Sequence, residues 1–488
     1  MLVSLLGISV QIFLQGKLLG IEEFLLAPAG ADADQVFLGR SHWVSLLTEV
    51  LPRAVLAELG LSKILLGSSG GGQFLVLLPE EARAAAEALL ELASAEIAAL
   101  SAGAVRLVWS ATENLGDWSV VRKRLADQMD ARRGAPGFSA EVRGDIAAAD
   151  AYFGYVLGWR LRETTRVGWS PDLPGRIQLG EGKHIWELGR GGDAIPFVHH
   201  TALDESGAKP ASSENLADRA KGLSTWGVLR GDVDNFGIRM RRAETIEQHI
   251  QLSVMYKQFF AGELDVQCSL PDYFRKVTVI YSGGDDFAVY GSWDALIGLG
   301  REIERVFHLF ADQNLKDFTG LEAKTITMAL AVAPSEDASL GAVFEEAGRR
   351  LESAKAADKD CFWLLGRTLE WKQFGEAAEL KDLLLRMISD FGCSPHYLRD
   401  ICGIYRETQA KMSKRQARRM GGERPWRYHR RLRRILSAAR PVTASNRQDY
   451  QKARTALIAD LIGRSAVTVK LRPAGRVALE WARLSAEA

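Results

Sequence analysis

The chain has 488 residues, of which 47% are hydrophobic and 25% are charged, and its 62 Lys and Arg nearly balance its 61 Asp and Glu. This composition is typical of a globular protein with about three or four domains, and the neutral balance excludes a chain that is basic throughout. The four cysteines form no CxxC pair, which excludes a disulfide framework and a four-cysteine zinc site and favours a reducing cytoplasm.

The first 110 residues predict an α/β unit built around a glycine-rich hairpin. Residues 2–14 are apolar, but they lack the basic flank and cleavage site of a signal peptide and are too short to span a membrane, so we interpret them as a buried strand. The hairpin carries the tip Ser69-Gly-Gly-Gly-Gln-Phe74. The other elements predicted from hydrophobic periodicity are helices over 41–59 and 80–100 and a strand over 104–110.

Residues 136–215 are rich in Gly, Asp and polar residues and predict an irregular connector without assignable chemistry. The segment contains no cysteine. The adjacent His199 and His200 therefore lack the thiolate partners that a zinc site of this kind needs.

The next unit repeats the order of the first. A strand over 224–230, a helix over 241–262, a hairpin over 277–290, a helix over 293–313 and a strand over 324–333 are expected. This order predicts the ferredoxin-like, or split βαβ, plan, an antiparallel sheet with helices on one face.

The two hairpins share the frame Ser-Gly-Gly-x-x-Phe. Ser282-Gly-Gly-Asp-Asp-Phe287 carries two carboxylates where Ser69-Gly-Gly-Gly-Gln-Phe74 carries Gly and Gln. The glycines are expected to adopt the positive φ of a tight turn. The repeat predicts a duplicated unit whose first copy has lost its acidic residues.

Adjacent carboxylates at a hairpin tip repel each other unless a cation lies between them. The first strand of the second unit ends in Gly231-Asp-Val-Asp234, and in this fold that strand end lies beside the tip. Asp232, and with it Asp234, is therefore expected to approach Asp285 and Asp286. Such a cluster is suited to a two-metal site with Mg²⁺ or Mn²⁺ for phosphoryl or nucleotidyl transfer.

Lys355 and Lys359 lie at the end of a predicted helix, just before the apolar strand 361–365. Lysines there can bind triphosphate oxygens as point charges. The alternative is that they are cations favoured in a last helical turn.

The region 375–488 predicts a helix bundle, with apolar spacing clearest over 379–391 and 449–463. Between residues 406 and 440 the chain has thirteen Lys or Arg and two acidic residues, with Trp426, Tyr428 and His429 among them. Cations with interleaved aromatics favour nucleic-acid contact. The alternative is a solvated helical face.

Together these motifs resemble the large subunit of type III CRISPR effector complexes, the Csm/Cmr large-subunit family. The resemblance rests on Gly231-Asp-Val-Asp-Asn-Phe-Gly237, the hairpin 282–287, the depleted hairpin 67–78, Leu38-Gly-Arg-Ser-His42 and the approach Asn215-Leu-Ala-Asp-Arg-Ala-Lys-Gly222. The GGDD tip alone would not be specific, because diguanylate cyclases and some polymerases have related tips.

The resemblance implies an α+β fold with two ferredoxin-like Palm domains facing each other. We expect a first Palm without metal ligands over 1–135, a connector without zinc cysteines over 136–215, a catalytic Palm over 216–372 and a basic helical bundle over 373–488. The bundle would lie along guide–target RNA and the small subunit. Its residues expected to face RNA or a partner are Arg415, Arg418, Arg419, Arg430 and Arg431.

The resemblance also implies that ATP is converted to cyclic oligoadenylate when target RNA is bound, as a 3′-hydroxyl attacks an α-phosphate and pyrophosphate leaves. The implied catalytic residues are Asp232, Asp285 and Asp286. The implied metal ligands are Asp232, Val233, Asp285 and Asp286. The implied nucleotide-binding residues are Ser282, Gly283, Gly284, Asn235, Phe236, Lys355 and Lys359.

The implied partners are the guide CRISPR RNA, target RNA, and the backbone, guide 5′-end cap and small subunits, with no membrane. The chain opens on the first Palm without the family's HD nuclease domain, so DNA cleavage is not expected. Three alternatives remain: a silent RNA-binding scaffold, a synthase of another ATP-derived signal, and a free-standing diguanylate cyclase, which would not explain the silent twin domain.

Overall fold

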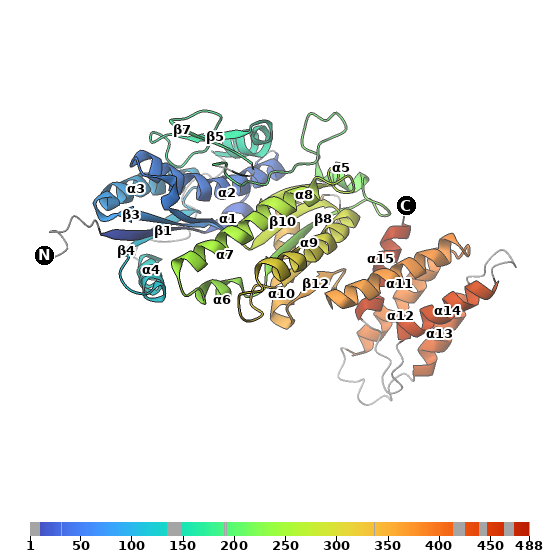
Figure 1. The fold of residues 1–488 in the computed structure, drawn as a ribbon. Coiled ribbons are helices and arrows are strands. Elements are labelled where there is room, and N and C mark those ends of the chain that lie inside the picture. The colour runs from blue at the N-terminus through green and yellow to red at the C-terminus, as the bar shows by residue number, and fades with distance from the viewer. Residues whose placement is uncertain are drawn as a thin grey trace.

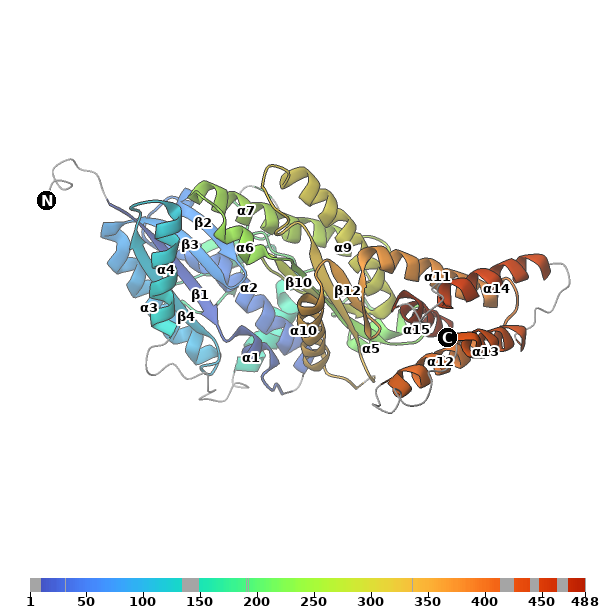
Figure 2. The same cartoon turned by 90° about the horizontal axis from the view of Figure 1, so that it is seen from below.

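The computed structural model describes residues 10–30, 32–133, 149–189, 191, 193–335, 337–412, 425–438, 447–462 and 473–487. The fold is mixed α+β, with two main sheets that lie next to each other and helices that extend from the second (Figure 1). We call residues 10–133 the first unit, 149–212 the connector and 213–370 the second unit. The C-terminal helices lie at the end of the molecule away from the first unit, in both views (Figure 2).

The first unit has a four-stranded antiparallel sheet in the order β2-β3-β1-β4. The predicted first strand is shifted, because β1 begins at Gln11 and runs to Leu19, and residues 1–9 lie outside the described part. The elements are β1 (Gln11–Leu19), α1 (Ile21–Leu26), α2 (Ala33–Glu58), η2 (Lys63–Leu65), β2 (Leu66–Gly70), β3 (Gln73–Pro79), η3 (Glu80–Ala82), α3 (Arg83–Leu100), β4 (Arg106–Glu113) and α4 (Trp118–Arg133).

The connector is more regular than the sequence predicted. It contains a π-helical segment that packs on α2, where Phe153 meets Trp43 edge to face with 5.5 Å between ring centroids. Bulky aromatic residues of this polar segment thus join the core of the first unit. Its elements are η5 (Tyr152–Trp159), η6 (Arg160–Glu163) and a small sheet of β5 (Arg166–Trp169), β6 (Gln178–Leu179) and β7 (His184–Glu187).

The second unit has a six-stranded sheet in the order β13-β12-β11-β8-β10-β9. Its strands β11-β8-β10-β9 repeat the order of the first sheet, β4-β1-β3-β2, with the same antiparallel pairing. The elements are α5 (Ser213–Asp218), β8 (Trp226–Val233), α6 (Phe236–Arg241), α7 (Ile246–Gln258), η7 (Phe259–Glu263), α8 (Leu264–Cys268), β9 (Val277–Ser282), β10 (Asp286–Ser292), α9 (Trp293–Asn314), β11 (Ile326–Val332), α10 (Leu340–Ala357), β12 (Cys361–Leu364) and β13 (Arg367–Glu370).

Helices cover both faces of this sheet, so the prediction of helices on one face was wrong for the second unit. Successive side chains of a strand point to opposite faces, and on β8 both Val228 and Leu229 are fully buried. Leu229 belongs to the core that includes Leu296 of α9, whereas Val228 packs in the core that includes Phe344 of α10. The apolar run of β8 therefore requires a helix layer on each side.

The C-terminal region is helical, as predicted, and continues directly from β13. Trp481 of the last helix stacks on Phe374 of the first at 5.7 Å, and the main-chain N–H of Leu223 donates to the carbonyl of Leu484 at 2.8 Å. The described helices are α11 (Trp371–Ser389), α12 (His396–Met412), α13 (Pro425–Ala438), α14 (Arg447–Ile462) and α15 (Pro473–Ala486).

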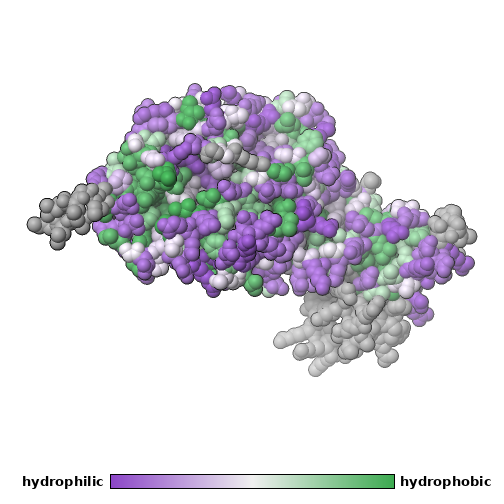
Figure 3. Space-filling view, viewed as in Figure 1, coloured by the Kyte–Doolittle hydropathy of each residue, from purple (hydrophilic) through white to green (hydrophobic). Residues whose placement is uncertain are grey.

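All four cysteines are free and buried, as expected for a chain without a disulfide framework. Within the described ranges, no helix is both long and apolar enough to cross a bilayer. On the face seen in Figure 3, hydrophilic and hydrophobic residues are interspersed.

Candidate functional site

The end of β8 and the acidic hairpin tip lie side by side, as the sequence predicted. The strand register places Asp286 directly opposite Asp232. The main-chain N–H of Val233 donates to the carbonyl of Asp285 at 2.9 Å, which fixes the tip against the strand end. Three carboxylates from two neighbouring strands thus gather at one edge of the second sheet.

Asp234 does not join this cluster, so that part of the prediction was wrong. Its side chain is 1% exposed. It accepts hydrogen bonds from the hydroxyls of Thr325 (2.8 Å) and Thr327 (2.7 Å) and from the main-chain N–H of Asp360 (2.9 Å). These donors satisfy the carboxylate internally, and Asp234 therefore ties β8 to the neighbouring strands.

The glycines of the acidic tip do not have the positive φ that was predicted for them. That conformation occurs in the first hairpin, where φ is 124° at Gly70, 58° at Gly71 and 74° at Gly72. Gly283 is needed for a different reason, because a Cβ there would lie 2.2 Å from a carboxylate oxygen of Asp286. The missing side chain makes room for the acid.

One cationic group and one neutral hydroxyl contact the carboxylates. The Lys355 ammonium lies 3.0 Å from Asp232, and the Tyr281 hydroxyl donates to Oδ2 of Asp286 at 3.0 Å. Arg230, two residues before Asp232 on the same face of β8, lies flat on the ring of Phe344 at 4.2 Å.

These contacts do not fully compensate the negative charge. Burial, together with the charges of Asp286 and Asp232, raises the pKa of Asp285 to about 8. Burial raises the pKa of Asp232 to about 6 although Lys355 opposes the shift. Burial also raises the pKa of Asp286 in spite of its bond from Tyr281. A raised pKa at three neighbouring acids is the electrostatic sign of a site that lacks a counter-charge.

The donor chemistry of the tip fits a divalent metal such as Mg²⁺, which prefers carboxylate oxygens. Val233 is 1% exposed and has an apolar side chain, so it could take part only through its main-chain carbonyl. Although the three carboxylates are neighbours, no group of three or more His, Cys, Asp or Glu side chains among the described residues is arranged to hold a metal ion in this conformation. Lys355 contacts Oδ1 of Asp232 and Tyr281 donates to Oδ2 of Asp286, so each of these contacts orients a carboxylate through one of its two oxygens.

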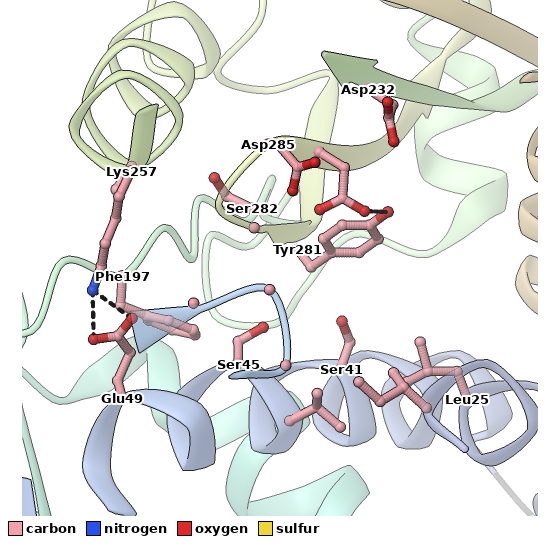
Figure 4. Close-up of a pocket in the computed structure, with 18 of the residues that line it drawn as sticks. Leu25, Ser41, Ser45, Glu49, Phe197, Asp232, Lys257, Tyr281, Ser282 and Asp285 are labelled. Atoms are coloured by element: carbon pink, nitrogen blue, oxygen red, sulfur yellow. Dashed lines mark hydrogen bonds and ion pairs between the residues drawn. The ribbon is translucent and has the colours of Figure 1, made fainter. Parts of the chain in front are cut away.

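The two hairpin tips face each other across a cavity of about 350 Å³ (Figure 4). A Cβ placed on Gly70 or Gly71 would lie 3.9 Å from the main-chain N of Gly284, so the tips nearly touch. The size is within the range of small-molecule sites. The cavity is lined by Ile21, Glu22, Leu25, Ser41, Val44, Ser45, Glu49, Gly70, Gly71, Gly72, Pro196, Phe197, Arg230, Asp232, Lys257, Ala261, Tyr281, Ser282, Gly283, Asp285, Asp286 and Phe344.

Sequence reasoning missed several of these side chains. Arg230 could have been found from its period-two spacing to Asp232, and Tyr281 from its place in the hairpin strand. Glu49 of α2, Lys257 of α7 and Phe197 of the connector carry no local signal, because only the folded chain brings them to the cavity.

The predicted nucleotide-binding residues divide into two groups. Ser282 and Gly283 line the cavity, Gly284 faces the first hairpin, and Lys355 contacts the acidic cluster. The other three, Asn235, Phe236 and Lys359, do not line the cavity.

Asn235 begins α6 with a φ of 60° and accepts a hydrogen bond from the Lys359 ammonium. The neighbouring Phe236 packs edge to face on Tyr256 at 5.0 Å. These contacts give all three residues a structural role in the loop after β8.

Of the residues predicted to contact nucleic acid, Arg430 is exposed and Arg431 is half-buried on α13. Arg433 and Arg434 extend the exposed face of this helix, while Leu432 and Leu436 face inward. The predicted residues Arg415, Arg418 and Arg419 lie outside the described residues.

Comparison with known proteins gives matches on both units. Residues 225–363 match the family model of the Cas10/Cmr2 second palm domain, and residues 10–107 match that of Csm1 subunit domain B. Two separate parts of the chain are thus similar to Cas10/Csm1 large subunits of type III CRISPR systems. The acidic hairpin of this chain lies within the part that matches the second palm domain.

One relative is the single-strand-specific deoxyribonuclease Cas10/Csm1 (subtype III-A) of Mycobacterium tuberculosis. It is 24% identical over 395 residues, which cover 62% of this chain and 48% of the relative. A second, from Thermococcus onnurineus, is 26% identical over 226 residues, or 41% of this chain and 27% of the relative. The chain thus spans about half, or less, of the curated relatives that it matches.

The fold is also similar to solved structures of a Csm1-Csm4 cassette. The cassette in complex with one ATP gives a TM-score of 0.68 at 17% identity and covers 98% of this chain and 70% of that one. The cassette in complex with cA4 gives a TM-score of 0.64 at 16% identity with the same coverage. At this identity the likeness establishes the fold.

Proposed function

We propose that the chain converts ATP to cyclic oligoadenylate by metal-dependent nucleotidyl transfer, as the large subunit of an RNA-guided type III complex in antiviral defence. The observation that carries the proposal is the register that sets Asp286 opposite Asp232, with Asp285 beside them in a cavity between two hairpins. The cassettes that bind ATP and cA4 support the choice of substrate and product.

In this proposal both sheets are Palm domains, and the two nucleotides lie between their hairpins. Asp232, Asp285 and Asp286 would hold Mg²⁺ or Mn²⁺, which when bound neutralises triphosphate charge and favours ionisation of the attacking hydroxyl. Gly283 allows close approach of phosphate to the main chain, and Lys355 supplies a cation beside Asp232. A bond forms from the 3′-oxygen to the α-phosphorus of the next nucleotide, and pyrophosphate leaves.

Further parts of the proposal concern partners. The Csm1-Csm4 cassettes support contact with a guide 5′-end cap subunit of the Csm4 kind. Guide and target RNA, with the small and backbone subunits, would contact the C-terminal helices through exposed cations such as Arg430. A cytoplasmic location stays a prediction.

The test is mass spectrometry of products formed by the purified assembly from ATP with Mg²⁺ or Mn²⁺, with and without matched target RNA. We expect adenylate oligomers only with target RNA. The double variant Asp285→Ala with Asp286→Ala should abolish them and leave RNA binding unchanged, since it removes oxygen ligands but no packing core.

Asp272→Ala is the matched control, because that aspartate is exposed and lies outside the cavity. Unchanged turnover in the double variant would contradict the assignment of the hairpin. Unconverted ATP in an assembly that binds its target would instead favour the scaffold alternative, whereas another ATP conjugate would favour the alternative signal.

A further inference from the structure

The connector enters the cavity through a short segment that both units hold. Ile195 is fully buried in the core of the first unit, and Val198, three residues later, is 4% exposed in the core of the second. The main-chain N–H of Val279 on β9 donates to the carbonyl of His200 at 2.9 Å. The main-chain N–H of Ala202 donates to the Thr278 hydroxyl at 3.0 Å. The segment is therefore anchored along the edge of the second sheet.

Phe197 lies between Ile195 and Val198 in the chain and forms part of the cavity wall. Its ring meets buried His42 edge to face at 5.6 Å and stacks on His199 at 5.6 Å with 15° between planes. These contacts fix the ring, yet Phe197 is only half-buried and lines the cavity. Figure 4 shows it beside Glu49 and Lys257, on the side of the first hairpin.

Packing alone does not account for this placement. An aromatic ring that served only as core would be buried like Ile195 and Val198, whereas Phe197 packs against the first core and leaves part of its surface to the cavity. The cavity also contains a hydrogen-bonding group that the protein leaves unused. Oγ of Ser282 is buried and has no hydrogen-bond partner among the described residues, and it lines the same cavity. A buried hydroxyl without a partner is costly unless a ligand satisfies it.

A rigid aromatic surface and an unpaired hydroxyl in the wall of one cavity match the chemistry of a nucleobase, which has an apolar π-face and a polar edge. We propose that Phe197 is the stacking platform for the base of one nucleotide in the cavity and that the Ser282 hydroxyl is available to the polar edge of a base. The inference deepens the proposed function, on which it rests for the nucleotide. It gives the connector a binding role that its sequence did not suggest.

The proposal separates two parts of a bound nucleotide. Phe197 acts on the base, while the acidic cluster with Lys355 acts on the phosphates. Removal of the ring should therefore weaken binding of ATP but leave binding of inorganic triphosphate unchanged. In turnover it should raise KM for ATP and leave kcat nearly constant, because stacking is the same before and during phosphoryl transfer.

The experiment measures binding of ATP and of inorganic triphosphate to the purified full chain by calorimetry with Mg²⁺ present. For Phe197→Ala we expect ATP affinity to fall by about 5- to 150-fold, the range that loss of base stacking gives. Phe197→Trp should restore it. Phe274→Ala is the matched control, because Phe274 is 47% exposed and lies outside the cavity.

Parental ATP affinity in Phe197→Ala would overturn the inference. An equal loss of ATP and triphosphate binding in a Phe197→Ala protein with the parental melting temperature would also overturn it. A parental chain that binds no ATP would overturn it as well. The binding readout is independent of turnover. If the parent binds ATP through Phe197 but forms no oligomer, the proposed reaction fails while this inference stands.

Discussion

The Lys257 ammonium on α7 lies 2.5 Å from a carboxylate oxygen of Glu49 on α2, and this ion pair joins the second unit to the first. The pair also contacts Arg53 (2.7 Å from Glu49) and the Ser69 hydroxyl (2.9 Å from either partner). The side chains of Glu49 and Lys257 are 6% and 14% exposed. Burial favours a raised pKa at Glu49, but Lys257 and Arg53 together hold that pKa below its usual value. At Lys257 burial prevails, and the pKa is lowered although Glu49 opposes the shift.

Loss of either partner of this pair should destabilise the protein. Glu49→Gln leaves the Lys257 ammonium buried without its counter-charge, which typically costs about 3–5 kcal/mol. Lys257→Met should cost less, because Glu49 keeps its contact with Arg53. The double variant should lose less than the sum, because the Lys257 charge that the loss of Glu49 leaves unpaired is also removed. Thermal unfolding of the four proteins measures this coupling.

The control is Lys123→Met, which breaks an exposed pair with Asp127 and should change stability by less than about 1 kcal/mol. Additive effects of the two single changes would contradict the assigned coupling between Glu49 and Lys257.

Tyr281→Phe should lower the rate of nucleotide synthesis. The change removes only the hydroxyl that donates a hydrogen bond to Asp286. A hydrogen bond to a charged group is worth about 1.5–3 kcal/mol. We expect roughly a tenfold or larger loss of ATP turnover in the RNA-bound assembly, with a higher Mn²⁺ concentration needed for half-maximal rate. Tyr155→Phe, at an exposed tyrosine, should behave like the parent. Equal rates and metal requirement for Tyr281→Phe and the parent would show that the bond does not position Asp286.

Gly348→Ala and Gly341→Ala, in the same helix α10, should have opposite effects on stability. A Cβ on Gly348 would lie 2.3 Å from a guanidinium nitrogen of Arg230, while one on Gly341 meets Leu26 at an ordinary 3.6 Å. Alanine gains about 1 kcal/mol over glycine within a helix, but overpacking costs about 1–3 kcal/mol. We therefore expect a higher melting temperature for Gly341→Ala and a lower one for Gly348→Ala. A higher melting temperature for both variants would mean that the Arg230 side chain leaves its place on Phe344 at little cost and makes room for the new methyl group.

Acid should destabilise the fold in a defined range of pH. Burial lowers the pKa of His42 to about 4, and His249 behaves in the same way. Since each folded-state pKa lies below the unfolded value of about 6.5, the unfolded chain binds more protons, and the unfolding free energy falls as pH decreases from about 6.5 to 4. Each histidine contributes about 3 kcal/mol at the acid end.

The check is the melting temperature between pH 7 and 5 in the parent and in His42→Asn. The variant should start lower at pH 7, because packing on Phe197 is lost, and should then fall less steeply. Parallel curves would contradict a buried, neutral His42.

The strand order and the acidic edge could be predicted from the sequence because both depend on local pattern. Apolar strands on either side of glycine pairs specify hairpins, and a repeated order specifies a repeated sheet. The approach of Asp232 to Asp286 follows from that topology alone. The sequence could not show that Asp234, unlike Asp232, stays out of the acidic cluster. The hydrogen-bond partners of Asp234, Thr325 and Thr327, are about 90 residues away in the chain.

Other features depend on packing between units, which no local pattern encodes. The second helix layer formed by α10, the pair Glu49–Lys257 and the entry of Phe197 all arise from contacts over long sequence separations. The φ values of Gly283 and Gly284 were mispredicted for a related reason. Their constraint is the space taken up by the Asp286 side chain and not the turn itself.

The burial of all four cysteines makes the native protein a convenient background for thiol labelling. Burial raises the pKa of Cys361 to about 12 and also raises the pKa of Cys268. Because the thiolate is the reactive form of cysteine, neither side chain should react at neutral pH. Cysteines introduced at Ile64 and Leu321, which are 84% and 85% exposed in the first and second units, would react selectively. Spin labels at these two sites would report the distance between the units without removal of any natural thiol.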